Sequence, residues 1–313
     1  MTAQIAHRGP DANGLWVSDA EVMLGHRRLS IIDTQEQSNQ PFIHEATGDV
    51  LVFNGEVYNY RELREELKGA FSFRTESDTE VVLAALQAWG AEALHRFNGM
   101  FAFAFWSREK RELLLARDRM GIKPLYFSET SHGLVFSSEV RSLLASGWID
   151  RRHDPIALAD YLRYQTVHAP RTIVQSVSML PAGHLMRLQG EETEISAWWD
   201  VPSETAKIDG GLPRTERLKR IRNAMEKAVD LRMRSDVPLG AFLSGGIDSS
   251  AIVGLMKSAT DQQISTFSVT FDEGEFDEST WSRMVAKRFD TDHHEIRLES
   301  QDFLHQVPEA LTA

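Results

Sequence analysis

The sequence predicts two domains of different class: an α+β domain at residues 1–200 and the start of an α/β parallel-sheet domain at residues 214–313. Three observations support this division. Short strand-like stretches bounded by turn residues dominate up to about residue 145. A polar stretch rich in Gly and Pro at residues 201–213 is typical of a linker. After it, strand and helix patterns alternate, as in a sheet with crossover helices. The length of 313 residues also favours two domains.

In the first domain, β-branched and aromatic residues mark six strands and a change of period marks three helices. The dense run from Met100 to Trp106 predicts a strand buried on both faces, as between stacked layers. One helix opens with the capping box Ser77-x-x-Glu80. The strands are expected at 14–19, 21–32, 49–59, 100–106, 112–118 and 133–139, and the helices at 60–69, 77–90 and 154–165. Two further strand-like stretches follow at 183–188 and 194–201.

In the second domain, strands are expected at 239–243, 264–271 and 293–298, with helices at 247–258 and 277–289 between them. A long amphipathic helix at 214–235 precedes them, with an apolar stripe of Leu218, Ile221, Met225, Ala228 and Val229. Three strands are few for a doubly wound domain. We therefore expect this domain to be incomplete.

Composition excludes several classes of function. Apolar residues make up 42% and charged residues 26% of the chain, which predicts a soluble protein. The formal net charge of −12 argues against a nucleic-acid partner. Neither a membrane-spanning run nor a signal peptide stands out, so we expect no membrane partner and a cytoplasmic location. The absence of cysteine excludes disulfides and thiolate metal sites.

The stretch 240–255, GAFLSGGIDSSAIVGL, is a predicted strand, glycine turn and helix. Free amides and the helix dipole make such a turn an anion site. Ser244, Ser249 and Ser250 would suit a pyrophosphate, and Asp248 would suit its Mg²⁺. The lysine of the common P-loop is missing, so the site differs from that of an ordinary kinase or GTPase. The alternative is a tight connection that binds nothing.

Six motifs in order carry a resemblance to a known family. They are HRGPD (7–11), GHRRLSIID (25–33), FNGEVYNY (53–60), SDTEV (77–81), RDRMGIKPLY (117–126) and SGGIDSS (244–250). Together they resemble glutamine-hydrolysing asparagine synthetases, which join a class II glutamine amidotransferase domain to an ATP pyrophosphatase (PP-loop) domain. The resemblance implies a four-layer αββα Ntn-hydrolase-type sandwich followed by an adenine nucleotide α-hydrolase-like sheet. It also implies ATP and Mg²⁺ as cofactors, glutamine and aspartate or another carboxylate as substrates, and a homodimer.

The resemblance assigns roles to particular residues. Arg28 would bind the glutamine α-carboxylate, Asp78 the α-ammonium, and Asn54 with Gly55 would form an oxyanion hole. The glutamine-binding set comprises Arg28, Leu29, Ser30, Ile31, Ile32, Asn54, Gly55, Glu56 and Asp78. The ATP-binding set comprises Leu243, Ser244, Gly245, Gly246, Asp248, Ser249, Ser250 and Val269, with Asp248 also the metal ligand.

Each of the glutamine-site assignments has a simpler alternative. Arg28 could form a surface salt bridge. Asp78 could serve only the dipole of its helix. The pair Asn54-Gly55 could be a type I′ hairpin turn.

The nucleophile of the resembled family, an N-terminal cysteine, has no counterpart in this sequence. The start also matches the family pattern only after its first strand and helix, and the end precedes later synthetase motifs. A fragment or miscalled reading frame, a cysteine-free variant and a decayed copy are the three explanations, and we expect the first, an inactive fragment. Alternatives for the family are a β-lactam synthetase, lasso-peptide cyclase or exosortase-associated relative, or a non-catalytic module that binds glutamine or a partner.

Overall fold

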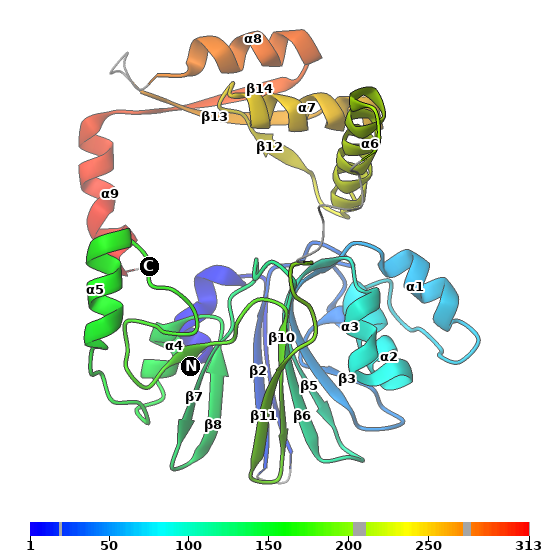
Figure 1. Ribbon diagram of the computed structural model, residues 1–313, viewed down its shortest axis with the longest axis vertical. Coiled ribbons are helices and arrows are strands. Elements are labelled where there is room, and N and C mark those ends of the chain that lie inside the picture. The colour runs from blue at the N-terminus through cyan, green and yellow to red at the C-terminus, as the bar shows by residue number, and fades with distance from the viewer. Residues whose placement is uncertain (19–20, 203–210, 272–276, 313) are drawn as a thin grey trace. The chain divides into compact units, whose positions relative to one another are not determined.

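The protein is described from a computed structural model, which covers residues 1–18, 21–202, 211–271 and 277–312. The chain separates into two compact units, Met1–Pro202 and Ser203–Ala313 (Figure 1). Residues 203–210 of the predicted linker lie outside the described residues. No helix of the described part is long and apolar enough to cross a membrane.

Three antiparallel sheets form the centre of the first unit. The large sheet has the order β11-β10-β6-β5-β4-β3, and the two small sheets have the orders β1-β2 and β8-β7-β9. The strands are β1 (Ala12–Val17), β2 (Met23–Arg28), β3 (Phe42–Ile43), β4 (Val50–Val57), β5 (Gly99–Ser107), β6 (Glu112–Arg117), β7 (Tyr126–Thr130), β8 (Gly133–Ser137), β9 (Ser178–Met179), β10 (His184–Gln189) and β11 (Glu192–Ala197).

The helices of this unit lie outside the sheets. The α-helices are α1 (Tyr60–Leu67), α2 (Asp78–Trp89), α3 (Ala93–Arg96), α4 (Val140–Leu144) and α5 (Pro155–Tyr164). The 3₁₀ helices are η1 (Thr2–Arg8), η2 (Glu36–Ser38) and η3 (Gly90–Glu92). Helices α1 to α3 cover one face of the large sheet, and η1 and α4 lie on the side of the small sheets (Figure 1).

Alternation along β4 and β5 divides the interior into two cores. Phe53 and Phe103 point toward α1 and α2, while Val52 and Ala104 point toward the small sheets. A third core packs α4 against β8. The result is the αββα arrangement of layers expected from the resemblance, with the strand at 100–106 buried on both faces as predicted. The second β layer is divided into two sheets, which the sequence did not indicate.

One of the two hydrogen bonds of the predicted capping box is present. The Ser77 side chain accepts a hydrogen bond from the Glu80 N–H at 3.2 Å. The Glu80 carboxylate does not return to Ser77, because it accepts from the Arg74 and Thr75 backbone N–H groups and from the Thr75 hydroxyl. The buried Glu80 therefore fixes the chain before the helix rather than the cap itself.

The second unit is a parallel sheet of order β12-β13-β14 with helices at its side. Its elements are α6 (Arg214–Arg232), β12 (Gly240–Phe242), α7 (Ile247–Ala259), β13 (Ser265–Phe271), α8 (Ser279–Phe289), β14 (Asp292–Leu298) and α9 (Ser300–Thr312). The predicted alternation is thus present. The stripe on α6 is buried only at its C-terminal end, where Val229 is 7% exposed. Leu218, Ile221 and Met225 are each at least 40% exposed.

Candidate functional site

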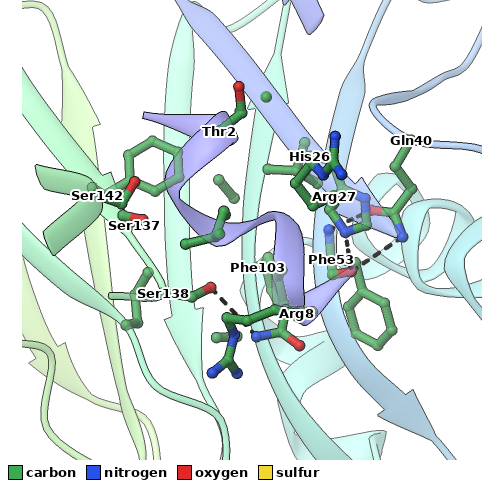
Figure 2. Close-up of a pocket in the computed structure, with 18 of the residues that line it drawn as sticks. Thr2, Arg8, His26, Arg27, Gln40, Phe53, Phe103, Ser137, Ser138 and Ser142 are labelled. Carbon is green, nitrogen blue, oxygen red and sulfur yellow. Dashed lines mark hydrogen bonds between the residues drawn. The ribbon is translucent and has the colours of Figure 1, made fainter. Parts of the chain in front are cut away.

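A cavity of about 970 Å³ lies within the first unit (Figure 2). It brings together most of the predicted glutamine site. Its floor is the large sheet, and β2, β8, η1 and the loop after β2 surround it. Eight of the nine predicted residues line it: Arg28, Leu29, Ile31, Ile32, Asn54, Gly55, Glu56 and Asp78. Ser30 does not line it, and its N–H donates to the Asp11 carboxylate at 2.8 Å.

Asn54 and Gly55 stand in the middle of β4, opposite Ala102 and Phe101 of β5. The hairpin alternative for this pair is therefore excluded. A Cβ at position 55 would lie 2.1 Å from the Met100 carbonyl oxygen, so only glycine fits this close approach of β5. The Asn54 side-chain amide donates to the Ser138 hydroxyl at 3.4 Å, which holds it at the wall of the cavity.

The Arg28 guanidinium is buried and holds the loop that follows β2. One terminal nitrogen donates to the Gln35 carbonyl at 3.0 Å and to the Asn39 side chain at 2.9 Å. The other donates to the Ile32 and Asp33 carbonyls. The surface salt bridge considered as its alternative does not fit, because Arg28 is 6% exposed and these four acceptors are carbonyl oxygens. Since both terminal nitrogens are used, the Nε–H is the donor that remains for a ligand.

Asp78, in the first turn of α2, is a second buried charge at the cavity. Its carboxylate accepts the Val57 N–H at 3.0 Å. The pKa of Asp78 is raised to about 7, chiefly by burial and also by the nearby Glu56 carboxylate, while the Val57 N–H opposes the rise. A bound ammonium would lower the pKa of Asp78 and keep its carboxylate ionised, because an opposite charge stabilises the ionised form. This environment suits a cation-binding role better than the helix dipole alone.

Sequence reasoning did not single out several polar residues of the cavity. Lys123, from the RDRMGIKPLY motif, faces it together with Glu56, and burial lowers the pKa of Lys123 while the Glu56 carboxylate opposes that shift. The Gln40 side-chain amide forms two hydrogen bonds to the Phe53 backbone. It donates to the Phe53 carbonyl at 3.1 Å and accepts from the Phe53 N–H at 2.6 Å. His26 Nε2 donates to the Phe53 carbonyl oxygen, 3.1 Å away, because that oxygen can only accept. Lys123 and His26 lie within the motifs RDRMGIKPLY and GHRRLSIID, whereas Gln40 lies outside the motifs of the sequence analysis.

In the second unit, the predicted anion loop lies between β12 and α7. Gly246 is the N-cap of α7 and no side chain caps the helix, so its first amides face solvent without a capping acceptor. The Ser244 and Ser249 hydroxyls lie 3.1 Å apart at this end. Gly245 has φ of +83°, and a Cβ there would lie 2.5 Å from the Trp281 side chain. This loop thus fits a phosphate group through helix amides and hydroxyls.

The other predicted nucleotide-site residues differ in exposure. The Leu243 side chain packs in the core with Val253, and its backbone N–H and carbonyl bond to the Phe267 carbonyl and the Ser268 hydroxyl. At 1% exposed, Leu243 is not open to a ligand, contrary to the prediction. Val269, on β13, is 43% exposed. Asp248 is exposed in the first turn of α7, where its carboxylate is free to approach a metal held by phosphate. Among the described residues, no cluster of three or more His, Asp or Glu side chains is arranged to bind a metal by itself.

Comparisons with known proteins give a family match for each of the two units. The family described as "Glutamine amidotransferase domain" matches residues 1–199, and the family described as "Asparagine synthase" matches residues 220–313. The chain belongs to the glutamine amidotransferase domain family, whose match covers more than half of it, and its second unit matches the asparagine synthase family. The two matches fall on the two compact units, and the cavity and the anion loop lie in the first and second match respectively.

Relatives of this family align with nearly all of the chain. Asparagine synthetase (glutamine-hydrolyzing) 1 of Bacillus subtilis is 36% identical over 98% of the chain and 48% of its own length. Amidase chry2 of Gibberella zeae is 35% identical over 95% of the chain and 46% of its own length. The chain therefore spans about half the length of these relatives. A glutamine phosphoribosylpyrophosphate amidotransferase structure from B. subtilis covers 94% of the chain and 61% of its own, with 15% identity and a TM-score of 0.47.

Proposed function

We propose that this chain carries the glutamine site and the ATP site of an asparagine synthetase. The full reaction would be aspartate + ATP + glutamine → asparagine + AMP + pyrophosphate + glutamate. The observation that carries the proposal is the single cavity in which residues from three separate motifs meet: Arg28, Asn54, Gly55 and Asp78. Their chemistry matches the carboxylate, amide and ammonium groups of one glutamine molecule.

In the proposed glutamine complex, Asp78 holds the α-ammonium and Arg28 orients the loop against the α-carboxylate. Leu29, Ile31 and Ile32 on that loop, with Glu56 on β4, complete the walls. Asn54 and the Gly55 backbone would stabilise the oxygen that gains charge when the side-chain amide is attacked. Loss of one such donor typically costs about 10²–10³-fold in rate.

ATP and Mg²⁺ are the proposed cofactors of the second unit, where ATP activates a carboxylate as its adenylate. Ser244, Gly245, Gly246, Ser249 and Ser250 would hold the phosphates, Val269 would border the adenosine, and Asp248 would approach Mg²⁺. Aspartate is the proposed acceptor by family. The Gibberella zeae relative carries the name amidase, so another carboxylate is the alternative. A cytoplasmic homodimer is part of the same proposal.

Calorimetric titration with glutamine tests the first site. Asp78→Asn should weaken glutamine binding by about tenfold or more, because the ammonium loses its counter-charge. Glu65→Gln is the matched control, since Glu65 is an exposed carboxylate on α1 outside the cavity. Equal glutamine affinities for these two variants and the unaltered chain would exclude Asp78 from the site, and an absence of glutamine binding would refute the proposal.

A second candidate is a glutamine-binding module without catalysis. It is favoured by the absence of cysteine from all 313 residues, because no thiol is then present beside Asn54 and Gly55. The two candidates separate in an assay of glutamate release from glutamine. Binding without glutamate release by this chain supports the module, and release above a heat-denatured control supports the enzyme.

A further inference from the structure

The edge of β4 that faces β3 presents the backbone of Gly55 to the cavity. Tyr58, just after β4, donates its N–H to the Asn98 carbonyl, just before β5, at 2.8 Å. Bonding alternates along an antiparallel ladder, so even-numbered residues of β4 bond to β5 and odd-numbered residues point to the opposite edge. On that edge β3 pairs only with Val50 and Leu51. Among the described residues, no strand therefore pairs with Gly55 on the side of the cavity that it lines.

The odd-numbered residues before and after Gly55 are both held. Val57 donates its N–H to the Asp78 carboxylate at 3.0 Å. Phe53 donates its N–H to the Gln40 side-chain oxygen at 2.6 Å, and its carbonyl accepts from the Gln40 side-chain nitrogen at 3.1 Å. Figure 2 shows the Gln40 side chain directed toward Phe53. Gly55 is thus an open position between two fixed ones on the same strand edge.

The Gln40 side chain takes the place of a strand residue. Phe42 of β3 pairs with Leu51, so the next hydrogen-bonded pair in this register would join Gln40 to Phe53. The Gln40 backbone carbonyl lies instead against Gly14 of β1, where a Cβ would approach it to 2.2 Å. A side-chain amide offers the same donor and acceptor as a backbone peptide group. The amide of Gln40 uses both on Phe53, and the ladder of β3 is thereby extended by one pair.

A second donor and a link to α2 complete this arrangement. His26 Nε2 donates to the same Phe53 carbonyl at 3.1 Å. The Gln40 side-chain nitrogen also donates to the Thr79 hydroxyl at 3.4 Å, and Thr79 follows Asp78 on α2. Gln40 and Phe53 are both buried, so water cannot readily replace these bonds. Gln40 therefore fixes the edge of β4 against the helix that carries the acid of the cavity.

We infer that Gln40 is a positioning residue of the glutamine site, and this role rests on the proposed glutamine complex. Its side chain fixes the strand next to Asn54, and with it the directions of the Asn54 side chain and the Gly55 N–H. These are the donors proposed for the oxygen of the glutamine side-chain amide, and such donors are effective when they are held in place beforehand. Both N–H groups of the Gln40 amide are used by Phe53 and Thr79, so Gln40 acts through β4 and not on the ligand.

Two ligands separate this role from a general effect on stability. Glutamine and L-norvaline share the α-ammonium and the α-carboxylate, but norvaline ends in a methyl group where glutamine has its side-chain amide. The ratio of the two affinities therefore reports the donors at Asn54 and Gly55, because the shared groups cancel. Gln40→Met should lower this ratio about threefold to tenfold, as expected for one misplaced hydrogen bond. Titration calorimetry of the whole chain measures glutamine binding, and competition with glutamine measures norvaline binding.

Gln87→Met is the matched control. The Gln87 side chain on α2 donates to Thr47 and Asp49 at 2.7 Å each and lies outside the cavity, so its loss should leave the ratio unchanged. Gln40→Asn is the second test variant. It keeps an amide that is one methylene shorter and cannot reach both backbone groups of Phe53, so the ratio should fall here as well. Slow hydrogen exchange at β5 identifies the variants that are folded.

The outcomes distinguish this role from the glutamine site itself. An unchanged ratio in a folded Gln40 variant would overturn the role of Gln40 and leave the glutamine site in place. Equal losses of glutamine and norvaline affinity would also overturn it, because Gln40 would then only support the fold. An unaltered chain that binds both ligands equally would remove the Asn54 and Gly55 donors from the site, and the role of Gln40 with them. An unaltered chain that binds neither ligand would refute the glutamine site.

Discussion

Val57 donates its backbone N–H to the Asp78 carboxylate at 3.0 Å. The bond joins the last residue of β4 to the first turn of α2, so it fixes the acid beside Gly55 and Glu56 on the cavity wall. Burial nevertheless raises the pKa of Asp78 to about 7, which is above its ordinary value near 3.8. The folded chain thus holds a carboxyl group that titrates close to neutral pH.

Glutamine affinity should therefore depend on pH through Asp78. Below about pH 7 the carboxyl is protonated and must lose its proton when the ammonium binds, so affinity should fall by up to about tenfold per pH unit. Above pH 7 it should level off. Titration calorimetry between pH 5 and 8 measures this slope, and Asp78→Asn should bind weakly with a flat profile. A slope that persists in that variant would assign the proton to another group.

The same titration should appear in stability. Because the folded pKa lies above the unfolded one, the contribution of Asp78 is fully present below about pH 4 and is lost as pH rises through about 7. In the absence of glutamine, the unfolding free energy of the unaltered chain should therefore fall relative to that of Asp78→Asn as the pH rises over this range. Denaturant unfolding at pH 4 and pH 8 checks the sign.

Arg28→Lys should destabilise the first unit although it keeps the charge. The guanidinium makes four hydrogen bonds to Gln35, Asn39, Ile32 and Asp33, and one ammonium cannot reach acceptors arranged around two nitrogens. We expect a loss of about 2–3 kcal/mol, as for buried acceptors left without donors. Glutamine binding should weaken as well, since the loop of Leu29 to Ile32 loses its anchor.

Arg27→Lys is the matched control, because the neighbouring Arg27 donates one bond, from Nε to the Gly9 carbonyl. Its cost should stay below about 1 kcal/mol, in the range of a single replaceable hydrogen bond. Chemical unfolding of both variants measures the two values. Similar losses for Arg27→Lys and Arg28→Lys would show that the four contacts of Arg28 contribute little.

How far the sequence predicts this fold depends on the kind of signal. The strand at 100–106 and the helix after Ser77 were predictable because apolar periodicity and a cap are local features. The division of the second β layer was not, because whether β2 and β8 become neighbours in one sheet depends on residues far apart in the chain. The helix α6 and its apolar stripe were predictable, but the exposure of most of that stripe was not, because periodicity shows an apolar face and not what covers it.

The candidate site shows a similar limit. Motif spacing identified eight residues that line one cavity, yet it could not reveal that the terminal nitrogens of Arg28 hold a loop. It also gave Asn54-Gly55 a hairpin alternative that only the ladder with β5 excludes. Burial, which sets the pKa of Asp78, follows from the packing of α2 on β4 and has no signature in a single sequence.

Gly246→Ala should weaken pyrophosphate binding without unfolding the second unit. Gly246 has an ordinary φ of −67°, and an added Cβ would meet only the Ser244 hydroxyl at 3.3 Å. The methyl group would instead crowd an anion at the helix start, and we expect a loss of about tenfold in affinity. Calorimetry with pyrophosphate checks it, and adenosine binding should be unchanged.

Gly245→Ala provides the contrast. At φ of +83° and with Trp281 2.5 Å from the new Cβ, alanine should cost about 1–3 kcal/mol in folding free energy. Its effect should appear in thermal unfolding before any ligand is added. If Gly246→Ala destabilises the second unit as much as Gly245→Ala does, its loss of pyrophosphate binding would follow from unfolding. It would then give no support to a phosphate site at this loop.

Asp248→Asn should affect the part of nucleotide binding that needs Mg²⁺. The Asp248 carboxylate is exposed in the first turn of α7, beside the amides that would hold phosphate, so its charge can approach a metal carried by that phosphate. Pyrophosphate affinity with Mg²⁺ should fall by about tenfold, while affinity without Mg²⁺ should hold or rise as a negative charge leaves the helix start. Asp261→Asn, an exposed acid beyond the other end of α7, should change neither value. Calorimetry with and without Mg²⁺ on the three proteins gives the comparison. An equal loss in both conditions would mean that Asp248 acts on the loop itself, because a metal ligand has no reason to weaken binding when the metal is absent.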